Sequence, residues 1–223
     1  MKPTIAIDGP AGAGKSTVSR RLAQALGLRY VDTGAMYRVV GVLADETGVD
    51  FADVAGLAAL CDALSLSFDE QADGVHVLAN GRDLTRAIRT AAAGQWASKV
   101  STQPVVRERL VALQRRMGAG GGVVMEGRDI GTVVLPDATV KIFLVASPAE
   151  RARRRWADLT ARGEAADLER IEREIAERDA RDSSRAHSPL TPAADALLVD
   201  TTAEGIDEVV ARVRNLVAGQ GNP

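Results

Sequence analysis

Residues 9–17 read GPAGAGKST and come one residue after the apolar run of residues 4–7. They contain a complete Gly-x-x-x-x-Gly-Lys-Ser pattern, which is the Walker A sequence of phosphate-binding loops. Glycines let the backbone approach a phosphate without a side-chain clash, and the helix that follows directs its positive end at the same anion. The pattern therefore predicts a strand, a loop and a helix in that order, with a nucleoside triphosphate as ligand.

The loop residues have separate expected roles. Lys15 would neutralise charge on the β- and γ-phosphates, and the Ser16 hydroxyl would hold Mg²⁺, with Thr17 behind it. The backbone N–H groups of the loop would face the phosphate oxygens. The predicted nucleotide-binding residues are Gly9, Pro10, Ala11, Gly12, Ala13, Gly14, Lys15, Ser16 and Thr17.

Short β-branched runs alternate along the chain with segments of helical periodicity, which is typical of a parallel sheet flanked by helices. After the loop, Val18, Leu22 and Leu26 recur at the spacing of one helical face, and Gly27 can end that helix in a left-handed conformation. The sequence therefore predicts an α/β fold. The candidate core strands are residues 4–7, 29–31, 123–125, 140–145 and 196–199.

One segment, from about residue 41 to residue 100, departs from this alternation. Between helical stretches it reads LSLSFDEQADGVHVLANGRDLT, in which the pairs Asp73-Gly74 and Asn80-Gly81 predict turns between short antiparallel strands. We interpret this segment as an insertion into the α/β core.

A second departure is the charged segment of residues 148–188. Leu168, Ile171 and Ile175 give it only a thin apolar stripe, so the simplest interpretation is a solvated helix crossed by ion pairs. The expected pairs at i, i+4 spacing are Glu169 with Arg173 and Glu174 with Arg178.

Arginine is abundant, since only four of the 28 Lys and Arg residues are lysines. A GC-rich genome explains much of this excess, so individual arginines are judged by position. Arg151, Arg154 and Arg155 share one helical face, and Arg178 and Arg185 are the first and last residues of the stretch RDARDSSR. Transfer of a phosphoryl group to another phosphate brings two polyanions together and needs a cationic clamp of this kind. The alternative for each arginine alone is a solvated helix surface.

Composition excludes some partners. The formal net charge of −2 and the pI of about 5.8 give no overall positive field for nucleic acid or an anionic membrane surface. The sequence shows no signal peptide and no transmembrane run, and its single Cys61 cannot form an internal disulfide. We expect a cytoplasmic protein with Cys61 in its core. His76 and His187 lack neighbours at metal-ligand spacing and are expected to be exposed or structural.

Other classes of phosphate-binding protein are less well supported. A switch GTPase needs an Asn-Lys-x-Asp stretch, which this sequence lacks. Motor-like ATPases carry an acidic residue at the end of a hydrophobic strand, and Glu126 and Asp200 are weak matches to that pattern. The Gly-rich MGAGGG at 117–122 precedes a strand, so we expect a turn there and no second phosphate loop.

Four further segments resemble bacterial cytidylate kinase, a nucleoside monophosphate kinase. They are DTGAMYR at 32–38, SKVSTQPVVRERLVALQR at 98–115, EGRDIGTVVLPDA at 126–138 and ERDARDSSRAHSPLTPAADA at 177–196. The resemblance runs in order along essentially the whole chain and includes an insertion near residues 62–90 that is typical of the bacterial cytidylate branch. It implies ATP-dependent phosphorylation of CMP and dCMP with Mg²⁺. The implied fold is a P-loop three-layer sandwich with a five-stranded parallel sheet, a monophosphate-binding subdomain and a short helical lid.

The resemblance also implies how phosphate groups are held. Thr33 and Arg38 would bind the acceptor monophosphate, helped by Arg128 and Arg185. The sequence departs from the family pattern where some members carry Ser in place of Thr33, and where the loop reads PAGAGKS in place of PSGAGKG. Both changes keep a usable hydroxyl. The predicted catalytic residues, all cationic, are Lys15, Arg128, Arg154, Arg155, Arg178 and Arg185.

For the nucleoside, the resemblance implies that Ser98, Arg107 and Asp129 face cytosine and that Arg178 and Asp182 meet the sugar–phosphate side. Cytosine presents an N4 amine where uracil presents an O4 acceptor, so a carboxylate such as that of Asp129 suits cytosine. The alternative for Asp129 is an ion pair with a neighbouring arginine.

We expect a monomer that acts on free CMP and dCMP and binds neither nucleic acid nor membrane. Two alternatives stay open: a P-loop kinase for UMP, AMP or shikimate, and a regulatory P-loop ATPase that would hydrolyse ATP without an acceptor. The expected organisation is a core of residues 1–40, 101–150 and 185–223, an inserted monophosphate-binding subdomain at 41–100, and a lid with flanking helices at 151–184.

Overall fold

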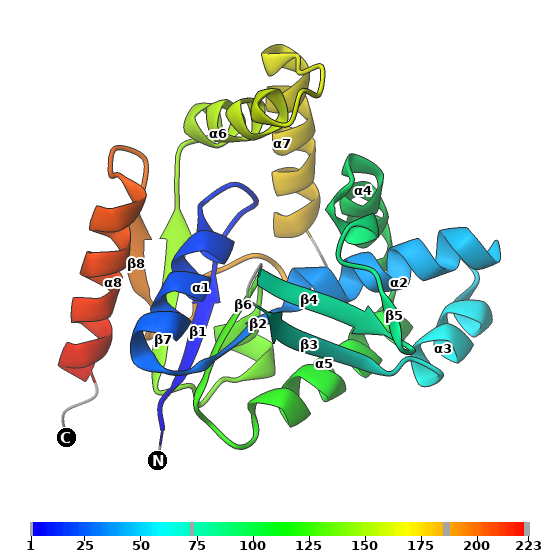
Figure 1. Ribbon diagram of the computed structural model, residues 1–223, viewed down its shortest axis with the longest axis horizontal. Coiled ribbons are helices and arrows are strands. Elements are labelled where there is room, and N and C mark those ends of the chain that lie inside the picture. The colour runs from blue at the N-terminus through cyan, green and yellow to red at the C-terminus, as the bar shows by residue number, and fades with distance from the viewer. Residues whose placement is uncertain (1, 72–73, 185–187, 221–223) are drawn as a thin grey trace. The chain divides into compact units, whose positions relative to one another are not determined.

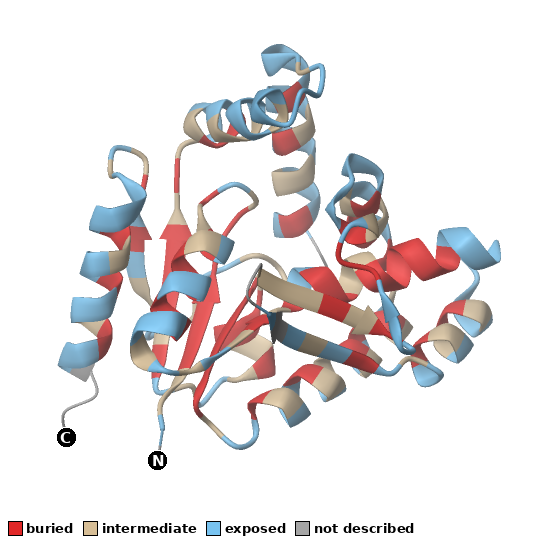
Figure 2. Ribbon diagram, in the orientation of Figure 1, coloured by how far each residue is buried: buried red, intermediate tan, exposed pale blue. Residues whose placement is uncertain are grey.

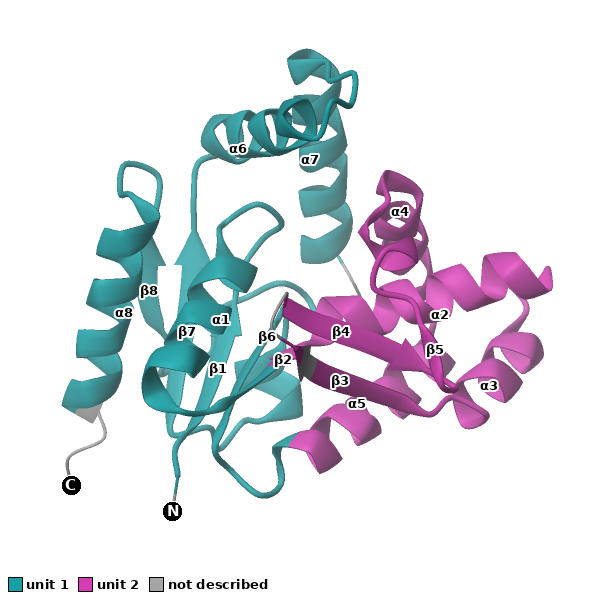
Figure 3. Ribbon diagram, in the orientation of Figure 1, with its two compact units in different colours: residues 1–30, 118–223 teal, residues 31–117 magenta. Residues whose placement is uncertain are grey.

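A computed structural model describes residues 2–71, 74–184 and 188–220 (Figure 1). The chain divides into two compact units, the first formed by Met1–Tyr30 with Gly118–Pro223 and the second by Val31–Met117 (Figure 3). The first unit therefore contains the predicted phosphate loop and the charged segment, and residues 41–100 of the predicted insertion all belong to the second.

A five-stranded parallel sheet with the order β2-β6-β1-β7-β8 confirms the predicted fold class. All five predicted core strands are present, one with the predicted bounds and the others with ends that differ by at most two residues. The strands are β1 (Thr4–Asp8), β2 (Arg29–Asp32), β6 (Val123–Gly127), β7 (Val140–Val145) and β8 (Leu197–Asp200).

The core of the first unit lies on the central strands, which are buried along most of their length (Figure 2). Helices α1 (Lys15–Leu26) and α8 (Ile206–Gln220) contribute their apolar faces to the same cluster as Ile5 and Leu144. Strands covered on both faces must be apolar throughout, which is why these segments read as continuous runs in the sequence.

Helix α1 begins and ends as its sequence predicts. It ends at Gly27, whose φ of 62° is left-handed and whose N–H bonds back to the last turn. The Gly-rich segment before β6 is a turn, as expected, with Gly121 and Gly122 both at φ 63°.

The charged segment forms two helices, α6 (Pro148–Ala161) and α7 (Leu168–Ser183). Of the thin apolar stripe, Ile171 and Ile175 pack on Ala152 in a small buried cluster, whereas Leu168 is 40% exposed. Leu168 is the first residue of α7, where the helix has no preceding turn to cover it.

Only one of the two predicted ion pairs has the predicted geometry. Arg173 lies 3.9 Å from Glu169, whereas Glu174 accepts from Arg170 at 2.9 Å. Arg178 lies 3.8 Å from Asp182, and Glu174 pairs with Arg170, so the prediction that pairs Arg178 with Glu174 is corrected.

The second unit combines helices with a three-stranded antiparallel sheet, as predicted for the insertion. Asn80 and Gly81, at φ 50° and 76°, form the expected two-residue turn, because both positions of such a turn need left-handed backbone. The Asp73 position of the other predicted turn lies outside the described residues. The elements are α2 (Thr33–Thr47), α3 (Val54–Asp62), β3 (Leu66–Gln71), β4 (Gly74–Ala79), β5 (Arg82–Asp83), α4 (Ala91–Val100) and α5 (Pro104–Gly118). Two short helical turns complete the chain, η1 (Ala87–Arg89) in this unit and η2 (Ile130–Val134) in the first.

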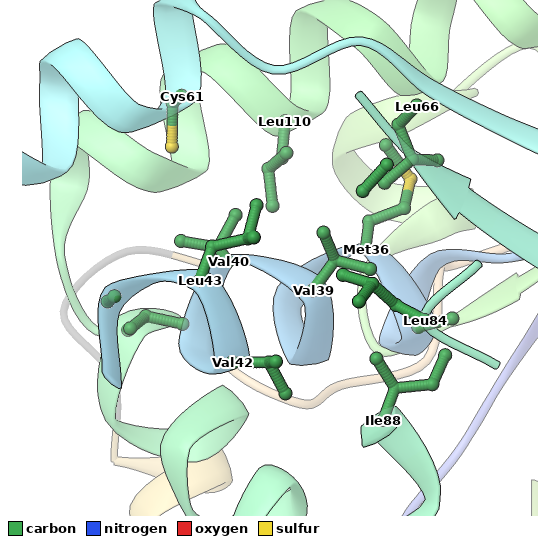
Figure 4. Packing of buried hydrophobic residues seen from close by; sticks show 14 of the residues in the cluster. Met36, Val39, Val40, Val42, Leu43, Cys61, Leu66, Leu84, Ile88 and Leu110 are labelled. Atoms are coloured by element: carbon green, nitrogen blue, oxygen red, sulfur yellow. The ribbon is translucent and has the colours of Figure 1, made fainter. Parts of the chain in front are cut away.

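Apolar side chains fill the interior of the second unit (Figure 4). Met36, Val39 and Val40 on α2 lie at its centre, and Leu110 of α5 faces them. Cys61 is 9% exposed and belongs to this cluster, which confirms its predicted core position, and burial raises the pKa of its thiol to about 11. No helix in the described part of the chain is long and apolar enough to cross a membrane.

Candidate functional site

The loop between β1 and α1 has a backbone that only glycine tolerates at its key positions. Gly9 has φ 145°, and a Cβ there would lie 2.1 Å from the carbonyl oxygen of Leu144. Gly12 and Gly14 adopt left-handed φ values of 80° and 88°. The glycines of the Walker A pattern thus fold the chain back over the end of the sheet and leave backbone at the surface of the loop.

The start of α1 has no side-chain cap, since Gly14 at the N-cap position has no side chain to offer. Helices α2, α3 and α4, by contrast, begin with a cap bond accepted by Asp32, Asp53 and Thr90. The first N–H groups of a helix have no partner within the helix, so an uncapped start behind a glycine loop is suited to an anion.

Lys15 lies at this start and is only 7% exposed. Its Nζ donates to the carbonyl oxygen of Pro10 at 2.8 Å, which bends the side chain back over the loop. Burial, followed by the nearby Arg128 cation, lowers the pKa of Lys15 well below its ordinary value. An anion bound in the loop would reverse this shift, because it favours the charged ammonium.

The Ser16 side chain is exposed at the first turn of α1, and Thr17 behind it is half-buried. No group of three or more His, Cys, Asp or Glu residues that could hold a metal occurs among the described residues. Mg²⁺ commonly takes one or two protein ligands and completes its shell with phosphate oxygens and water. The exposed Ser16 hydroxyl beside the loop fits a metal ion that arrives with a nucleotide.

Asp8 is a residue of this region that the sequence analysis missed. It ends β1 directly before Gly9, is 5% exposed, and its two carboxylate oxygens accept from the backbone N–H groups of Ile130 and Gly131, each at 2.8 Å. Burial raises the pKa of Asp8 to about 6, against the lowering effect of these two bonds. Asp8 therefore ties the segment that follows β6 to the start of the phosphate loop.

The two strand-end carboxylates considered from the sequence have different surroundings. Glu126 is 3% exposed and accepts from the hydroxyl of Tyr30. Asp200 is exposed and accepts from the backbone and the hydroxyl of Thr202, as in a turn. The signal that would have selected Asp8 instead is its place one residue before the glycine loop.

Arg128 connects three parts of the first unit. Its Nε donates to Asp182 at 2.9 Å, and its Nη1 donates to the carbonyl oxygen of Gly9 at 2.9 Å. Asp182 is 1% exposed and lies 3.8 Å from Arg178 as well. Three predicted site residues, Arg128 directly after β6 and Arg178 and Asp182 on α7, are therefore gathered beside the phosphate loop.

The three arginines predicted to share one face of α6 differ in burial and in their bonding partners. Arg154 donates to Glu150 and Thr201, and its Nη1 lies 3.8 Å from the point where a Cβ on Gly14 would lie. Arg155 is half-buried, whereas Arg151 is nearly fully buried and bonded to the loop itself. Arg154 is thus adjacent to the loop, and Arg151 is part of its support.

Asp129, the residue predicted to read the base, is 6% exposed and directly precedes η2. Its negative charge contributes to the raised pKa of Asp8, so the two carboxylates are near neighbours in the first unit. Arg185 and His187 lie outside the described residues. His76 in β4 bonds through its Nδ1 to Asp83 in β5 at 2.7 Å, which gives it a structural partner.

Four predicted substrate residues belong to the second unit. Thr33 is buried at the start of α2, and Arg38 of the same helix donates to the carbonyl oxygen of Ile88 at 3.1 Å. Arg107 is 7% exposed on α5. Ser98 on α4 is 4% exposed, and its hydroxyl has no partner among the groups that the structure describes. A buried hydroxyl of this kind is suited to a ligand that supplies the missing bond.

Comparison with known sequences decides the family. The family described as cytidylate kinase matches residues 5–219. The chain belongs to the cytidylate kinase family. A cytidylate kinase of Pelotomaculum thermopropionicum is 54% identical over 212 residues, which cover 95% of this chain and 94% of that protein. One of Geobacillus kaustophilus is 50% identical over 214 residues and 96% of both chains.

Solved structures with a similar fold were also found. An uncharacterized protein from Eubacterium ventriosum has a TM-score of 0.52 at 12% identity and covers 98% of this chain and 99% of its own. A protein from Thermus thermophilus has a TM-score of 0.50 at 15% identity and covers both chains completely. These identities are low, so the likeness concerns the α/β fold alone.

Proposed function

We propose that this member of the cytidylate kinase family transfers the γ-phosphoryl group of ATP to CMP and dCMP, with ADP and CDP or dCDP as products. The observation that carries the proposal is the match of residues 5–219 to the family, with relatives near 50% identity over almost the whole chain. The glycine loop, the uncapped start of α1 and the buried Lys15 support the donor half of the reaction.

On the donor side, the loop amides and Lys15 would bind the phosphates of ATP. Lys15 would exchange its bond to the Pro10 carbonyl for one to a β- or γ-phosphate oxygen. Mg²⁺, held in part by Ser16, would neutralise phosphate charge when bound. Arg154, which already lies beside Gly14, and Arg155 on the same helix would add positive charge at the transferring group.

On the acceptor side, the arginines and hydroxyls would hold the monophosphate and the base. Thr33, Arg38, Arg128 and Arg185 are proposed for the phosphate, and Arg178 with Asp182 for the sugar–phosphate side. Ser98, Arg107 and Asp129 are proposed for cytosine. The orphan hydroxyl of buried Ser98 supports this assignment, because a base edge would supply its missing partner.

Little covalent chemistry is required of the protein. Phosphoryl transfer depends on alignment of the two phosphates and on stabilisation of charge, which a set of fixed cations and amides supplies. We therefore assign no general base.

The segment of residues 151–184 is proposed to act as a lid. The core of residues 1–40, 101–150 and 185–223 and the monophosphate-binding subdomain of residues 41–100 are proposed in the same way. The buried apolar cluster of the lid segment is small, so the segment should open more easily than the central sheet. Hydrogen exchange in α6 and α7 should be faster than in β1 without ligand and should slow with CMP and an ATP analogue. Exchange as slow as in β1 and unchanged by ligand would contradict the lid.

The experiment for the function is a coupled assay of ADP release with a panel of acceptors: CMP, dCMP, UMP, AMP, shikimate and none. We expect CMP and dCMP to be the efficient acceptors, with CMP at least about tenfold better than UMP in kcat/KM. Efficient turnover of AMP or shikimate instead, or equal ADP release without acceptor, would contradict the proposal. The monomeric state and cytoplasmic location remain predictions; light scattering after size exclusion tests the first.

A further inference from the structure

Arg151 on α6 is a cation with 3% exposure, and its partners account for its burial. Its Nη1 and Nη2 bind the carboxylate of Asp179 on α7 in a two-pronged pair. Its Nε donates to the carbonyl oxygen of Ala146 at 3.0 Å, and its Nη1 also donates to that of Ala11 at 3.1 Å. All three guanidinium nitrogens are therefore engaged within the protein.

The side chain of Arg151 also packs against the next residue of the loop. A Cβ on Gly12 would lie 3.0 Å from the Cβ and 3.4 Å from the Cγ of Arg151. Arg151 therefore contacts two consecutive loop residues, through its guanidinium at Ala11 and through its stem at Gly12.

These contacts fix the direction of one peptide group. A trans peptide is planar, so its N–H points away from its C=O. Because the carbonyl of Ala11 is held toward Arg151, the N–H of Gly12 is directed to the opposite side. Arg128 holds the carbonyl of Gly9 in a similar way, but the next residue is Pro10, which has no N–H to direct.

We infer that Arg151, held by Asp179, is a positioning residue that sets the Ala11–Gly12 peptide with its N–H available to the phosphates of the donor nucleotide. The inference rests on the proposed function, because it assumes that the loop binds ATP. It assigns Arg151 no contact with substrate, in contrast to the neighbouring Arg154. It also makes the shape of the donor loop depend on α7, because Asp179 belongs to that helix.

The test compares two conservative variants with two matched controls. Asp179→Asn and Arg151→Lys weaken the two-pronged pair while keeping similar size. Glu174→Gln and Arg170→Lys make the same chemical changes in the exposed Arg170–Glu174 pair on α7. The affinity of each protein for an ATP analogue with Mg²⁺ is measured by calorimetry without CMP, and KM for ATP and for CMP is measured separately.

We expect Asp179→Asn and Arg151→Lys to weaken binding of the ATP analogue about five- to tenfold, with KM for CMP within about twofold of wild type. The two control variants should match wild type both in affinity for the ATP analogue and in KM for CMP. In the NMR spectrum, the Gly12 amide signal should shift in Asp179→Asn and stay in place in Glu174→Gln. Circular dichroism and thermal unfolding check that each variant is folded.

Wild-type donor affinity in both Arg151→Lys and Asp179→Asn would overturn the inference. Equal losses for ATP and CMP would also overturn it, because they would show a general structural role. Failure of the wild-type protein to phosphorylate CMP counts against the proposed function alone, since binding of the ATP analogue is measured without an acceptor. Absence of analogue binding in wild type would overturn both.

Discussion

The phosphate-loop region of the first unit and the apolar cluster of the second unit both contain buried side chains, but of different kinds. Around the loop, Asp8, Lys15 and Arg151 are charged and between 3% and 7% exposed. In the second unit, Met36 and Leu57 are fully buried among other apolar side chains. Each of the three charges bonds to backbone, and each apolar residue has only packing neighbours to stabilise it.

Buried charged side chains and buried apolar side chains contribute differently to stability and to function. Burial of an ion costs several kcal/mol unless its partners compensate, so a cluster of buried charges is a poor source of stability. Burial of an apolar side chain contributes about 1.5–3 kcal/mol to stability directly. The charged region is therefore expected to govern activity and pH dependence, and the apolar cluster to govern the free energy of unfolding.

The largest effect on stability is expected for Leu57→Ala in the apolar cluster. Removal of a fully buried Leu side chain leaves a cavity and should lower the free energy of unfolding by about 2–5 kcal/mol. Urea unfolding measures it. At a temperature where the variant is folded, kcat should stay within about twofold of wild type. A loss below about 1 kcal/mol would contradict the role assigned to the cluster.

Lys15→Ala should show the opposite pattern. Loss of one charge-assisted contact to the transferring phosphates should slow turnover about a hundredfold or more, equivalent to roughly 3 kcal/mol. The free energy of unfolding should be unchanged or higher, because a buried cation is removed. Arg20→Ala, an exposed cation on the same helix, is the matched control and should behave as wild type. Near-wild-type turnover in Lys15→Ala would refute the phosphate-loop assignment.

Asp129→Ala tests whether a buried charge of the first unit reads the base. If the carboxylate accepts from cytosine N4, the variant should lose far more kcat/KM with CMP than with UMP. The ratio of kcat/KM for CMP to kcat/KM for UMP should fall by about tenfold, since an unpaired buried polar group costs about 1–3 kcal/mol. Asp137→Ala, an exposed carboxylate nearby in sequence, serves as control. Equal proportional losses would assign Asp129 a structural role and move base reading to Ser98 and Arg107.

Asp8 should make the free energy of unfolding depend on pH between about pH 4 and 6, whereas the described residues of the apolar cluster include no group that titrates in this range. Its pKa is about 6 in the folded protein against 3.8 for the ordinary side chain, so between these values the folded state binds more protons. The contribution of Asp8 to the free energy of unfolding therefore falls as pH rises from about 4 to 6, by up to about 1.4 kcal/mol per pH unit.

Urea unfolding of wild type and Asp8→Asn across pH 4–7 measures this contribution as the difference between the two proteins. Because Asn does not titrate, the difference should change across the window and level off above about pH 6.5. A constant difference would mean that the pKa of Asp8 is not raised by folding.

The sequence was sufficient to predict the elements whose signals are local. Gly27 and Asn80-Gly81 need left-handed backbone, and the apolar strand runs need cover on both faces, so these predictions were confirmed. The partners of long charged side chains were less predictable. Glu174 bonds to Arg170, although Arg178 lies at the same four-residue spacing on its other side and is an equally reasonable partner from spacing alone.

The supports of the loop could not be predicted because they depend on tertiary structure. Asp8 bonds to residues more than 120 positions away, and Arg151 binds Asp179 on another helix. Periodicity placed Arg151 with Arg154 and Arg155 on one face, but it carried no information about which arginine the fold would bury. The roles proposed for the substrate residues remain predictions of the family resemblance.

The most direct test of the proposed reaction is the stoichiometry of its products. Wild-type protein is incubated with Mg-ATP, with and without CMP, and ADP and CDP are quantified by chromatography. We predict that CDP and ADP form in a 1:1 ratio with CMP, and that ADP formation without CMP is slower by at least about a hundredfold. ADP released at the same rate in both reactions, with no CDP, would contradict the account and indicate an ATPase.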